Sequence, residues 1–172
     1  MNIQTAGQQK YYDFIEERAK KLRTGMIVWE SLLAAAFIGM FSDAGIAAVL
    51  ALAGGALAMV NIKAQKALKG RLDVVEDQEE FFRQLTDADM AEFENYRLII
   101  TKDYVLSGAG DTAVYPLSGM EKVEVRLHGK AGKTLFLVDR QEKSHEIISC
   151  SDEAGMQKEF DLAFRLMSER VS

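Results

Sequence analysis

The chain has 172 residues, with 21 Lys or Arg against 26 Asp or Glu and a formal net charge of −5. This length allows one ordinary domain, or a short membrane module followed by a small soluble domain. From residue 95 onward eleven bases stand against twelve acids, which excludes the basic surface that nucleic-acid binding requires. The average hydropathy is unremarkable, but apolar and charged residues are strongly segregated along the chain.

Residues 1–24 are polar and predict a cytoplasmic amphipathic helix. Tyr11, Phe14, Ile15 and Leu22 fall at helical spacing, so this helix can continue without a break into the apolar residues that follow. The acids in this segment do not fit a cleavable signal peptide, which needs a short apolar stretch and a small-residue cleavage site.

Residues 25–62 predict a transmembrane hairpin of two helices. The runs 25–41 and 44–61 contain 17 and 18 residues, so at helical rise each covers roughly 25 to 27 Å of a bilayer core of about 30 Å. One continuous helix would place Asp43 near the middle of the bilayer, at a cost of about 2.5 to 3.5 kcal/mol. A turn at "FSDAG" avoids this cost. A buried hairpin of a soluble domain is the alternative.

Basic residues flank both apolar runs and are absent from the turn. Under the positive-inside rule, both termini are then cytoplasmic in a multi-pass protein of the cell membrane. The same bases are candidate contacts for anionic lipid headgroups, at about 1 kcal/mol per charge, although such clusters commonly do no more than set topology. They are Lys20, Lys21, Arg23, Lys63, Lys66, Lys69 and Arg71.

Small residues recur every four positions in both runs and indicate close helix packing, within one hairpin or between protomers. Alanine-rich helices also produce such stripes by chance. Glu30 is the one ionisable residue inside a span, which makes it a candidate intramembrane polar site, with a tolerated interfacial acid as the alternative. The candidate packing residues are Ser31, Ala35 and Gly39 in the first run and Ala47, Ala51 and Gly55 in the second.

Residues 63–95 predict a helical connector in which the charge changes sign. Four bases and no acid occupy residues 63–71, whereas nine acids and the single base Arg83 occupy residues 73–94. Apolar residues interleave with these acids, which favours a packed helix over a disordered acidic tail.

From residue 96 to residue 172 the period changes to that of strands. "RLIITKDYVLSG" predicts two strands around a turn at Lys102 and Asp103, "EKVEVRLHG" alternates, and "KTLFLVDRQEKSHEIISC" predicts two more strands. A closing helix is expected after Ser151 as N-cap. The fold class is therefore an α+β membrane protein, with an antiparallel sheet of five to seven strands. The expected buried face of the last helix comprises Met156, Phe160, Ala163, Phe164, Met167 and Val171.

This order of elements resembles the bacterial pleckstrin-homology-like domains, which often occur beside membrane hairpins. "LIITKDYVLSG", "VYPLSGMEKVEV", the hairpin through "TLFLVD" and the terminal helix carry the resemblance, over about residues 96–170. Eukaryotic relatives of this fold bind phosphoinositides through a basic loop between the first two strands. That loop is here the minimal "KD" turn, so the resemblance implies no such lipid site.

No catalytic, cofactor or metal residues are predicted. "HGKAGKT" at residues 128–134 lacks the first glycine of a phosphate-binding loop, because Leu127 stands there, and it joins two strands. His128 and His145 have no carboxylate or cysteine at metal-ligand spacing, and the lone Cys150 is expected to be a reduced structural thiol.

The sequence predicts a non-catalytic adaptor that is anchored in the lipid bilayer and presents a cytoplasmic domain to an unknown protein partner. An exposed sheet edge that accepts a strand is one way to bind such a partner. A structural protein that assembles with itself into a homo-oligomer is the alternative. A subunit of an enzyme or transporter is less favoured, because no polar pathway or catalytic set is present.

Overall fold

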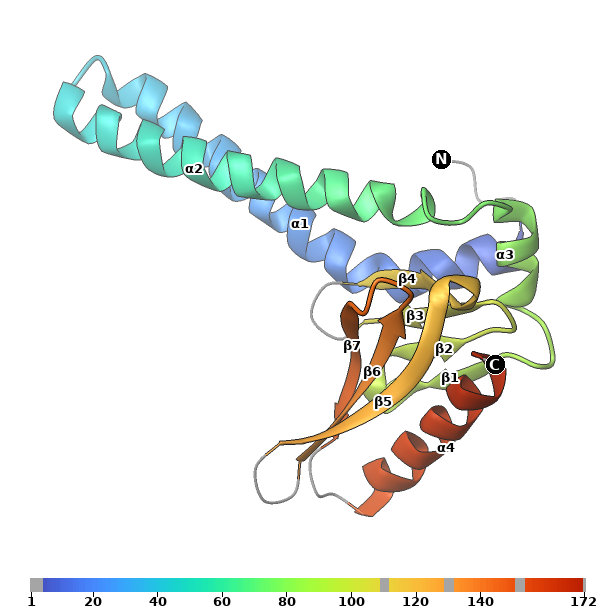
Figure 1. The fold of residues 1–172 in the computed structure, drawn as a ribbon. Helices are drawn as coiled ribbons and strands as arrows, with labels where there is room; N and C mark the ends of the chain where they lie inside the picture. Colours follow the sequence, from blue (N-terminus) through green and yellow to red (C-terminus); the bar gives the residue numbers. More distant parts are fainter. Residues whose placement is uncertain (1–4, 109–111, 129–131, 151–153, 172) are drawn as a thin grey trace. The chain divides into compact units, whose positions relative to one another are not determined.

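The computed structural model describes residues 5–108, 112–128, 132–150 and 154–171 (Figure 1). The fold is α+β and consists of two compact units. The hairpin unit is Ile15–Gly70, and the β unit combines Met1–Phe14 with Arg71–Ser172. These bounds differ from the segments expected from the sequence, because the first 14 residues group with the β unit.

Two long helices, α1 (Ala6–Gly39) and α2 (Ala44–Lys69), form the hairpin and are both long and apolar enough to span a membrane. Thr5 starts α1: its hydroxyl oxygen accepts from the Gln8 amide at 3.2 Å, while Gln8 Oε1 accepts from the Thr5 amide at 3.3 Å. Asp43 caps α2, since its Oδ1 accepts from the amides of Gly45 and Ile46. The expected continuous first helix and the expected turn are confirmed.

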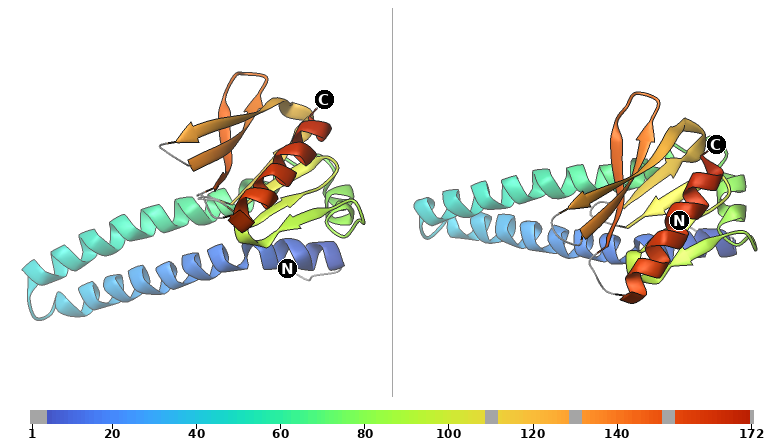
Figure 2. Two further views of the ribbon diagram at one scale, coloured as in Figure 1. Left: turned by 90° about the horizontal axis from the view of Figure 1, so that it is seen from below. Right: turned by 60° about the horizontal axis from the view of Figure 1, so that its bottom comes forward.

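The two helices of the hairpin lie side by side and antiparallel (Figure 2) and meet along residues that are spaced three or four positions apart. This spacing is typical of left-handed helix pairs. Ala36 and Ala47 are buried, and Gly54 sits where an added Cβ would be 3.0 Å from the side chain of Leu33. The α2 residues of this seam are Ala47, Leu50, Gly54, Ala58, Asn61, Gln65 and Leu68.

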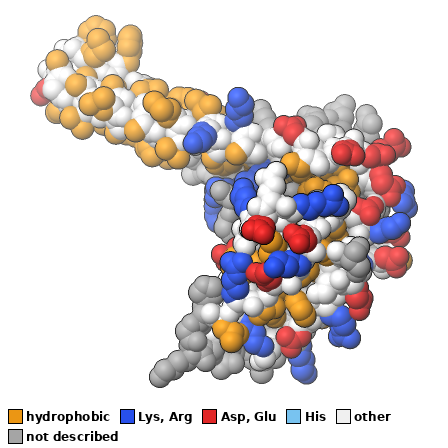
Figure 3. Space-filling view, in the orientation of Figure 1, with side chains coloured by type: hydrophobic (Ala, Val, Ile, Leu, Met, Phe, Trp, Pro, Cys, Tyr) orange, Lys and Arg blue, Asp and Glu red, His pale blue; other side chains and the backbone are white. Residues whose placement is uncertain are grey.

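The outer surface of the hairpin is apolar and exposed. Only 6% of the most apolar window of α1 and 17% of that of α2 are buried. Leu52 and Met59 are each 75% exposed and Phe41 is 81% exposed. Figure 3 shows apolar side chains covering the hairpin from its turn, with basic side chains near its other end.

The β unit contains two antiparallel sheets, of four and three strands, and a C-terminal helix. The strand order follows the chain in each sheet, β1-β2-β3-β4 and β5-β6-β7, so each connection is a hairpin or a short link. The strands are β1 (Ala91–Phe93), β2 (Leu98–Ile100), β3 (Tyr104–Ser107), β4 (Ala113–Pro116), β5 (Met120–His128), β6 (Gly132–Asp139) and β7 (Ser144–Cys150), and short 3-10 turns occupy Gly70–Leu72, Glu94–Tyr96 and Leu117–Gly119.

The core of the β unit lies between the two sheets and is covered by α4 (Ala154–Arg170). Inward side chains alternate along the strands, as Leu135 and Leu137 do on β6, and both are fully buried. Phe160, Ala163 and Met167 of α4 are also buried in this core. Phe164 was expected on the same face but is 37% exposed. Ser151, the expected cap of this helix, lies outside the described residues.

The other face of the four-stranded sheet is buried as well, which explains the unbroken apolar run in "LII". Ile99 and Leu106 lie on that face and are 1% and 0% exposed. The short helix α3 (Gln78–Gln84) places Phe81 against the ring of Tyr104, at 5.1 Å between centroids, and against Tyr11, at 5.8 Å. Tyr11, in the first turns of α1, is therefore part of the β unit core.

Strand β1 is the element that the sequence did not predict, because it lies in the segment expected to be a helical connector. Only part of that connector is helical: α2 continues to Lys69, and α3 has seven residues. Gln84 at the end of α3 is 1% exposed and binds the turn between β2 and β3, donating to an Asp103 carboxylate oxygen and accepting from the Asp103 amide at 3.1 Å. This interaction fixes α3 on the sheet.

Candidate functional site

A polar contact joins the two helices of the hairpin. Asn61 Nδ2 of α2 donates to the Leu22 carbonyl oxygen of α1 at 2.9 Å, and Gln65 Nε2 donates to Asn61 Oδ1 at 2.7 Å. Gly25 makes room for this amide, since an added Cβ there would lie 2.6 Å from Asn61 Nδ2. Asn61 and Gly25 mark the predicted ends of the two spans, so this hydrogen bond joins the helices where the apolar segment ends.

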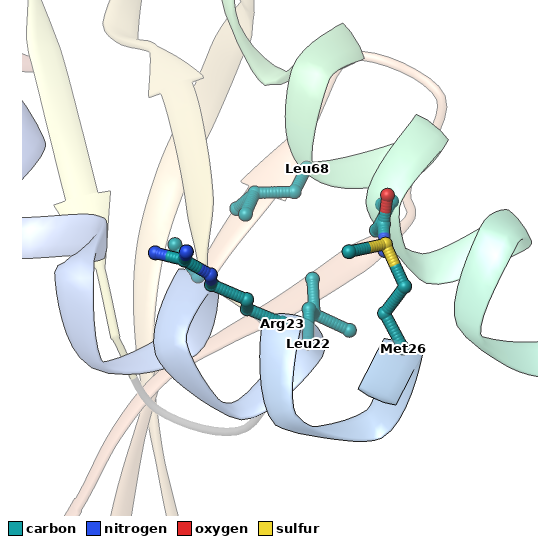
Figure 4. A pocket seen from close by; sticks show the side chains of 6 residues that line it. Leu22, Arg23, Met26 and Leu68 are labelled. Carbon is teal, nitrogen blue, oxygen red and sulfur yellow. The ribbon is translucent and has the colours of Figure 1, made fainter. Parts of the chain in front are cut away.

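A cleft of about 230 Å³ opens between the helices beside this contact (Figure 4). In Figure 4, Leu22 and Met26 extend from α1 towards α2, Leu68 extends from α2, and Arg23 leaves α1 to the side. Apolar side chains thus line the cleft next to one guanidinium. The lining residues are Ala19, Leu22, Arg23, Met26, Gln65 and Leu68.

The predicted lipid-contacting bases fall into different groups. Lys20 and Lys21 are bound to acids one turn earlier on α1, Lys20 to Glu16 at 2.8 Å and Lys21 to Glu17 at 2.6 Å. Among the described residues no ion pair involves the exposed bases of the hairpin unit, Arg23, Lys63 and Lys66. The side chain of Lys69 lies outside the described part of the structure. Arg71 is half-buried and belongs to the β unit.

The predicted small-residue stripes are mostly on the outside of the hairpin. Gly39 and Ala47 face each other, because a Cβ on Gly39 would lie 3.6 Å from that of Ala47. Ser31, Ala35 and Ala51 are exposed. A Cβ on Gly55 would meet nothing within 4 Å. The stripe residues on α2 beyond Ala47 are therefore available for a contact outside this hairpin.

Glu30, the predicted intramembrane polar site, is exposed on α1. Leu32 and Leu33, and not Glu30, supply the α1 atoms nearest to Gly54 of α2. The structure describes no polar partner that would single out Glu30 as an ion or proton site.

Strand β5 is a nine-residue edge strand of the three-stranded sheet. Its outer face carries a base, an acid and a base, in which Glu124 binds Lys122 at 2.7 Å and Arg126 at 2.9 Å. Its other face exposes two apolar side chains, Val125 at 39% and Leu127 at 75%. A long strand with an unpaired edge and exposed apolar residues is able to pair with another chain.

A carboxylate and imidazole pair, which the sequence reading missed, closes the turn between β6 and β7. Asp139 Oδ2 lies 3.0 Å from His145 Nε2, and Asp139 Oδ1 accepts from the amides of Gln141 and Lys143. The hydrogen bond to His145 and these amides hold the pKa of Asp139 below its usual value. Metal-ligand spacing in the sequence does not reveal this pair, because the turn brings together residues six positions apart.

The Asp139 and His145 pair stabilises the turn between β6 and β7. The described residues contain no cluster of three or more His, Cys, Asp or Glu side chains able to hold a metal ion. Cys150 is buried in the core of the β unit and is not part of a disulfide. Residues 129–131 of the loop motif at residues 128–134 lie outside the described residues.

Comparison with protein-family models, with curated proteins and with solved structures gave no match to this chain. Three surfaces of the chain itself bear on its function: the apolar exterior of the hairpin, the cleft at its base and the edge of β5.

Proposed function

We propose that this protein is a non-catalytic adaptor that is anchored in the cell membrane and binds a protein partner on its cytoplasmic β unit. The observation that carries the binding role is the unpaired edge of β5, with Val125 and Leu127 exposed beside it. The apolar hairpin supports the membrane anchor, so the anchor and the binding role are supported by independent features.

The exterior of the hairpin supports the anchor. A core helix of a soluble protein is mostly buried, whereas α1 and α2 expose large apolar side chains along most of their apolar length. Water would make that exposure costly, at about 25 cal/mol for each Å² of apolar surface. A bilayer removes the cost, and the flanking bases favour a topology with both termini on the cytoplasmic side.

The layout of the β unit supports a pleckstrin-homology-like domain. The resemblance implies antiparallel strands followed by a C-terminal amphipathic helix. The β unit has this layout, with seven antiparallel strands followed by α4. The structure adds β1 before the strands expected from the sequence, so the loop between the first two strands is residues 94–97 and not the "KD" turn. This loop is also short, and it holds one acid and one base. This geometry favours a protein ligand elsewhere on the unit over a phosphoinositide in that loop.

We place the partner on β5 as an added strand. Main-chain groups along a free edge supply hydrogen bonds, and alternate side chains supply selectivity. The outer row of Lys122, Glu124 and Arg126 carries one net positive charge, so an acidic residue in the incoming strand fits opposite it. The apolar row of Val125 and Leu127 would cover an apolar residue of the same strand.

The test is affinity purification of the full chain from native membranes in mild detergent, with the wild type compared with Leu127→Glu. Leu127 is largely exposed, so the substitution leaves the fold intact while it places a charge in the apolar row. Leu162→Glu is the matched control, since Leu162 is 41% exposed on α4 and lies outside β5. A stoichiometric partner lost with Leu127→Glu and kept with Leu162→Glu supports the proposal, and a partner retained by both variants contradicts it.

Self-assembly is the second candidate, and the open space next to Gly55 favours it. Ala51 and Gly55 form part of a small-residue stripe that does not face α1. Because lipid tails give no hydrophobic drive for helix association, close approach of backbones at small residues is a main source of affinity in membranes.

Two substitutions separate association from folding of the hairpin. Gly55→Leu projects into open space and is expected to weaken only a contact with a second copy. Gly39→Leu projects towards Ala47 and is expected to disturb the hairpin itself. A Gly55→Leu protein that keeps the wild-type mass in detergent, measured by light scattering, would exclude self-assembly through this stripe.

A further inference from the structure

The cleft at the base of the hairpin combines an apolar lining with a positive charge. Leu22, Met26 and Leu68 supply the apolar surface, while Gln65 and Arg23 supply polar groups at its margin (Figure 4). At about 230 Å³ the cleft is smaller than the usual ligand pocket, which begins at about 300 Å³. It is therefore suited to receive part of a larger amphipathic molecule.

The cleft lies at the level of the lipid headgroups if the hairpin spans the membrane. Ala19 precedes Gly25, the start of the predicted first span, by six residues, which is about 9 Å of helix. The headgroup layer on each side of a bilayer is about 5 to 8 Å thick. Met26 is then inside the hydrocarbon edge, and Arg23 is among the headgroups.

Charge points to an anionic occupant. Arg23 has no ion pair among the described residues of the chain, in contrast to Lys20 and Lys21, which lie three and two positions earlier. On α2, residues 63–69 carry three bases and no acid. A guanidinium binds a phosphate through two parallel hydrogen bonds, and this geometry is stronger and more selective than that of an ammonium group.

We propose that the cleft binds one anionic phospholipid of the cytoplasmic leaflet. The phosphate lies at Arg23, and the upper part of an acyl chain lies against Leu22, Met26 and Leu68. The side-chain amide of Gln65 has two hydrogens and donates one of them to Asn61. The second can donate to an ester oxygen of the lipid. This inference depends on the proposed membrane anchor and adds a defined lipid site to it.

The experiment is native mass spectrometry of the full chain in mild detergent, titrated with phosphatidylglycerol and, separately, with phosphatidylcholine. The wild type is expected to retain one phosphatidylglycerol at least about tenfold more tightly than phosphatidylcholine, as one charge-assisted contact provides. Arg23→Gln removes this preference. Lys20→Gln, with the same change of charge on the same helix but outside the cleft, keeps it.

A second variant tests the cleft itself. Ala19→Phe places a ring in the cleft and is expected to weaken binding of both lipids, and its helical content by circular dichroism checks that the hairpin still forms. Equal binding of the two lipids by the wild type overturns the inference. An equal loss of the phosphatidylglycerol preference in Arg23→Gln and Lys20→Gln would also overturn it, because it would indicate diffuse electrostatic attraction. A second copy of the chain found in the cleft in place of lipid would overturn it as well.

Failure of the anchor is distinguishable in the same preparation. Alkaline extraction of the membranes reports whether the chain is integral. A chain released by this treatment contradicts both the anchor and the lipid site. A chain that resists extraction but shows no preference for phosphatidylglycerol contradicts the lipid site alone.

Discussion

Gly25 and Asn61 are expected to act as one unit in the hairpin, and a double-mutant cycle tests this. In the structure, Asn61 Nδ2 donates to the Leu22 carbonyl at 2.9 Å across the helix pair. A methyl group at Gly25 would lie 2.6 Å from the same nitrogen. This is about 0.9 Å inside ordinary contact, which begins near 3.5 Å. Gly25→Ala must therefore push the amide away from its acceptor.

The size of the coupling follows from the hydrogen bond that is lost. Hydrogen bonds between helices in a membrane protein contribute about 0.6 kcal/mol on average and at most about 1.7 kcal/mol. Asn61→Ala is expected to lower hairpin stability by that amount. Gly25→Ala removes the same bond and also changes helix propensity, but the propensity effect is equal in both backgrounds and cancels in the cycle. The coupling energy is then about 0.6 to 1.7 kcal/mol.

The assay is unfolding of the full chain from mild mixed micelles by added sodium dodecyl sulfate. Trp29 is the only tryptophan of the chain and lies half-buried on α1, one turn after Gly25, so its fluorescence reports on the contact between the helices. Additive effects of Gly25→Ala and Asn61→Ala would refute the reasoning, because they would mean that the glycine does not act through the amide.

Three further outcomes are expected in the β unit of the full chain. Phe81→Ala removes a fully buried ring and is expected to lower the free energy of unfolding by about 3 to 5 kcal/mol; a change below about 1 kcal/mol in a denaturant titration would contradict its place in the core. Gln84→Ala frees the turn at Asp103 and should speed amide hydrogen exchange at residues 101–104, measured by mass spectrometry, whereas unchanged exchange would show that the amide does not hold the turn. Hydrogen bonds from Arg83 and then from Gln84 lower the pKa of Glu80 from 4.5 to about 2. A lowered carboxyl pKa stabilises the fold above pH 4.5, and this contribution is lost as the pH falls from 4.5 to about 2. Glu80→Gln should flatten the pH dependence of the melting temperature in this window, and an unchanged slope would contradict the assignment.

The hairpin was predictable from the sequence because it depends on the order of apolar and polar residues along the chain. Two apolar runs separated by a polar turn fix the helices, and Asp43 in the turn is also the residue that caps α2. The identity of the facing residues was not predictable in the same way. A four-residue repeat of small side chains suggested one face, whereas the helices meet along a face that carries Asn61 and Gln65.

In the β unit, too, local elements were predictable from the sequence, whereas contacts between distant residues were not. Alternating residues predicted β5 and the strands after it, because one face of each strand is buried. The strand β1 was missed because it has three residues and follows an acidic helix. The contact of Tyr11 with Phe81 was missed for another reason: it joins residues 70 positions apart, and no local pattern records such a contact.

The polar seam of the hairpin also bears on which proposed function is right. In a bilayer, helices gain little from hiding apolar side chains from one another, so packing and hydrogen bonds decide which faces meet. Asn61 and Gln65 satisfy this requirement within a single chain. The hairpin therefore does not need Ala51 and Gly55 for its own fold, and these residues remain exposed or half-buried on α2. A stripe that folding does not use is either a chance product of an alanine-rich helix or a contact for another helix. The mass of the Gly55→Leu protein in detergent distinguishes these two cases, and with them the structural protein from the adaptor that works as a single copy.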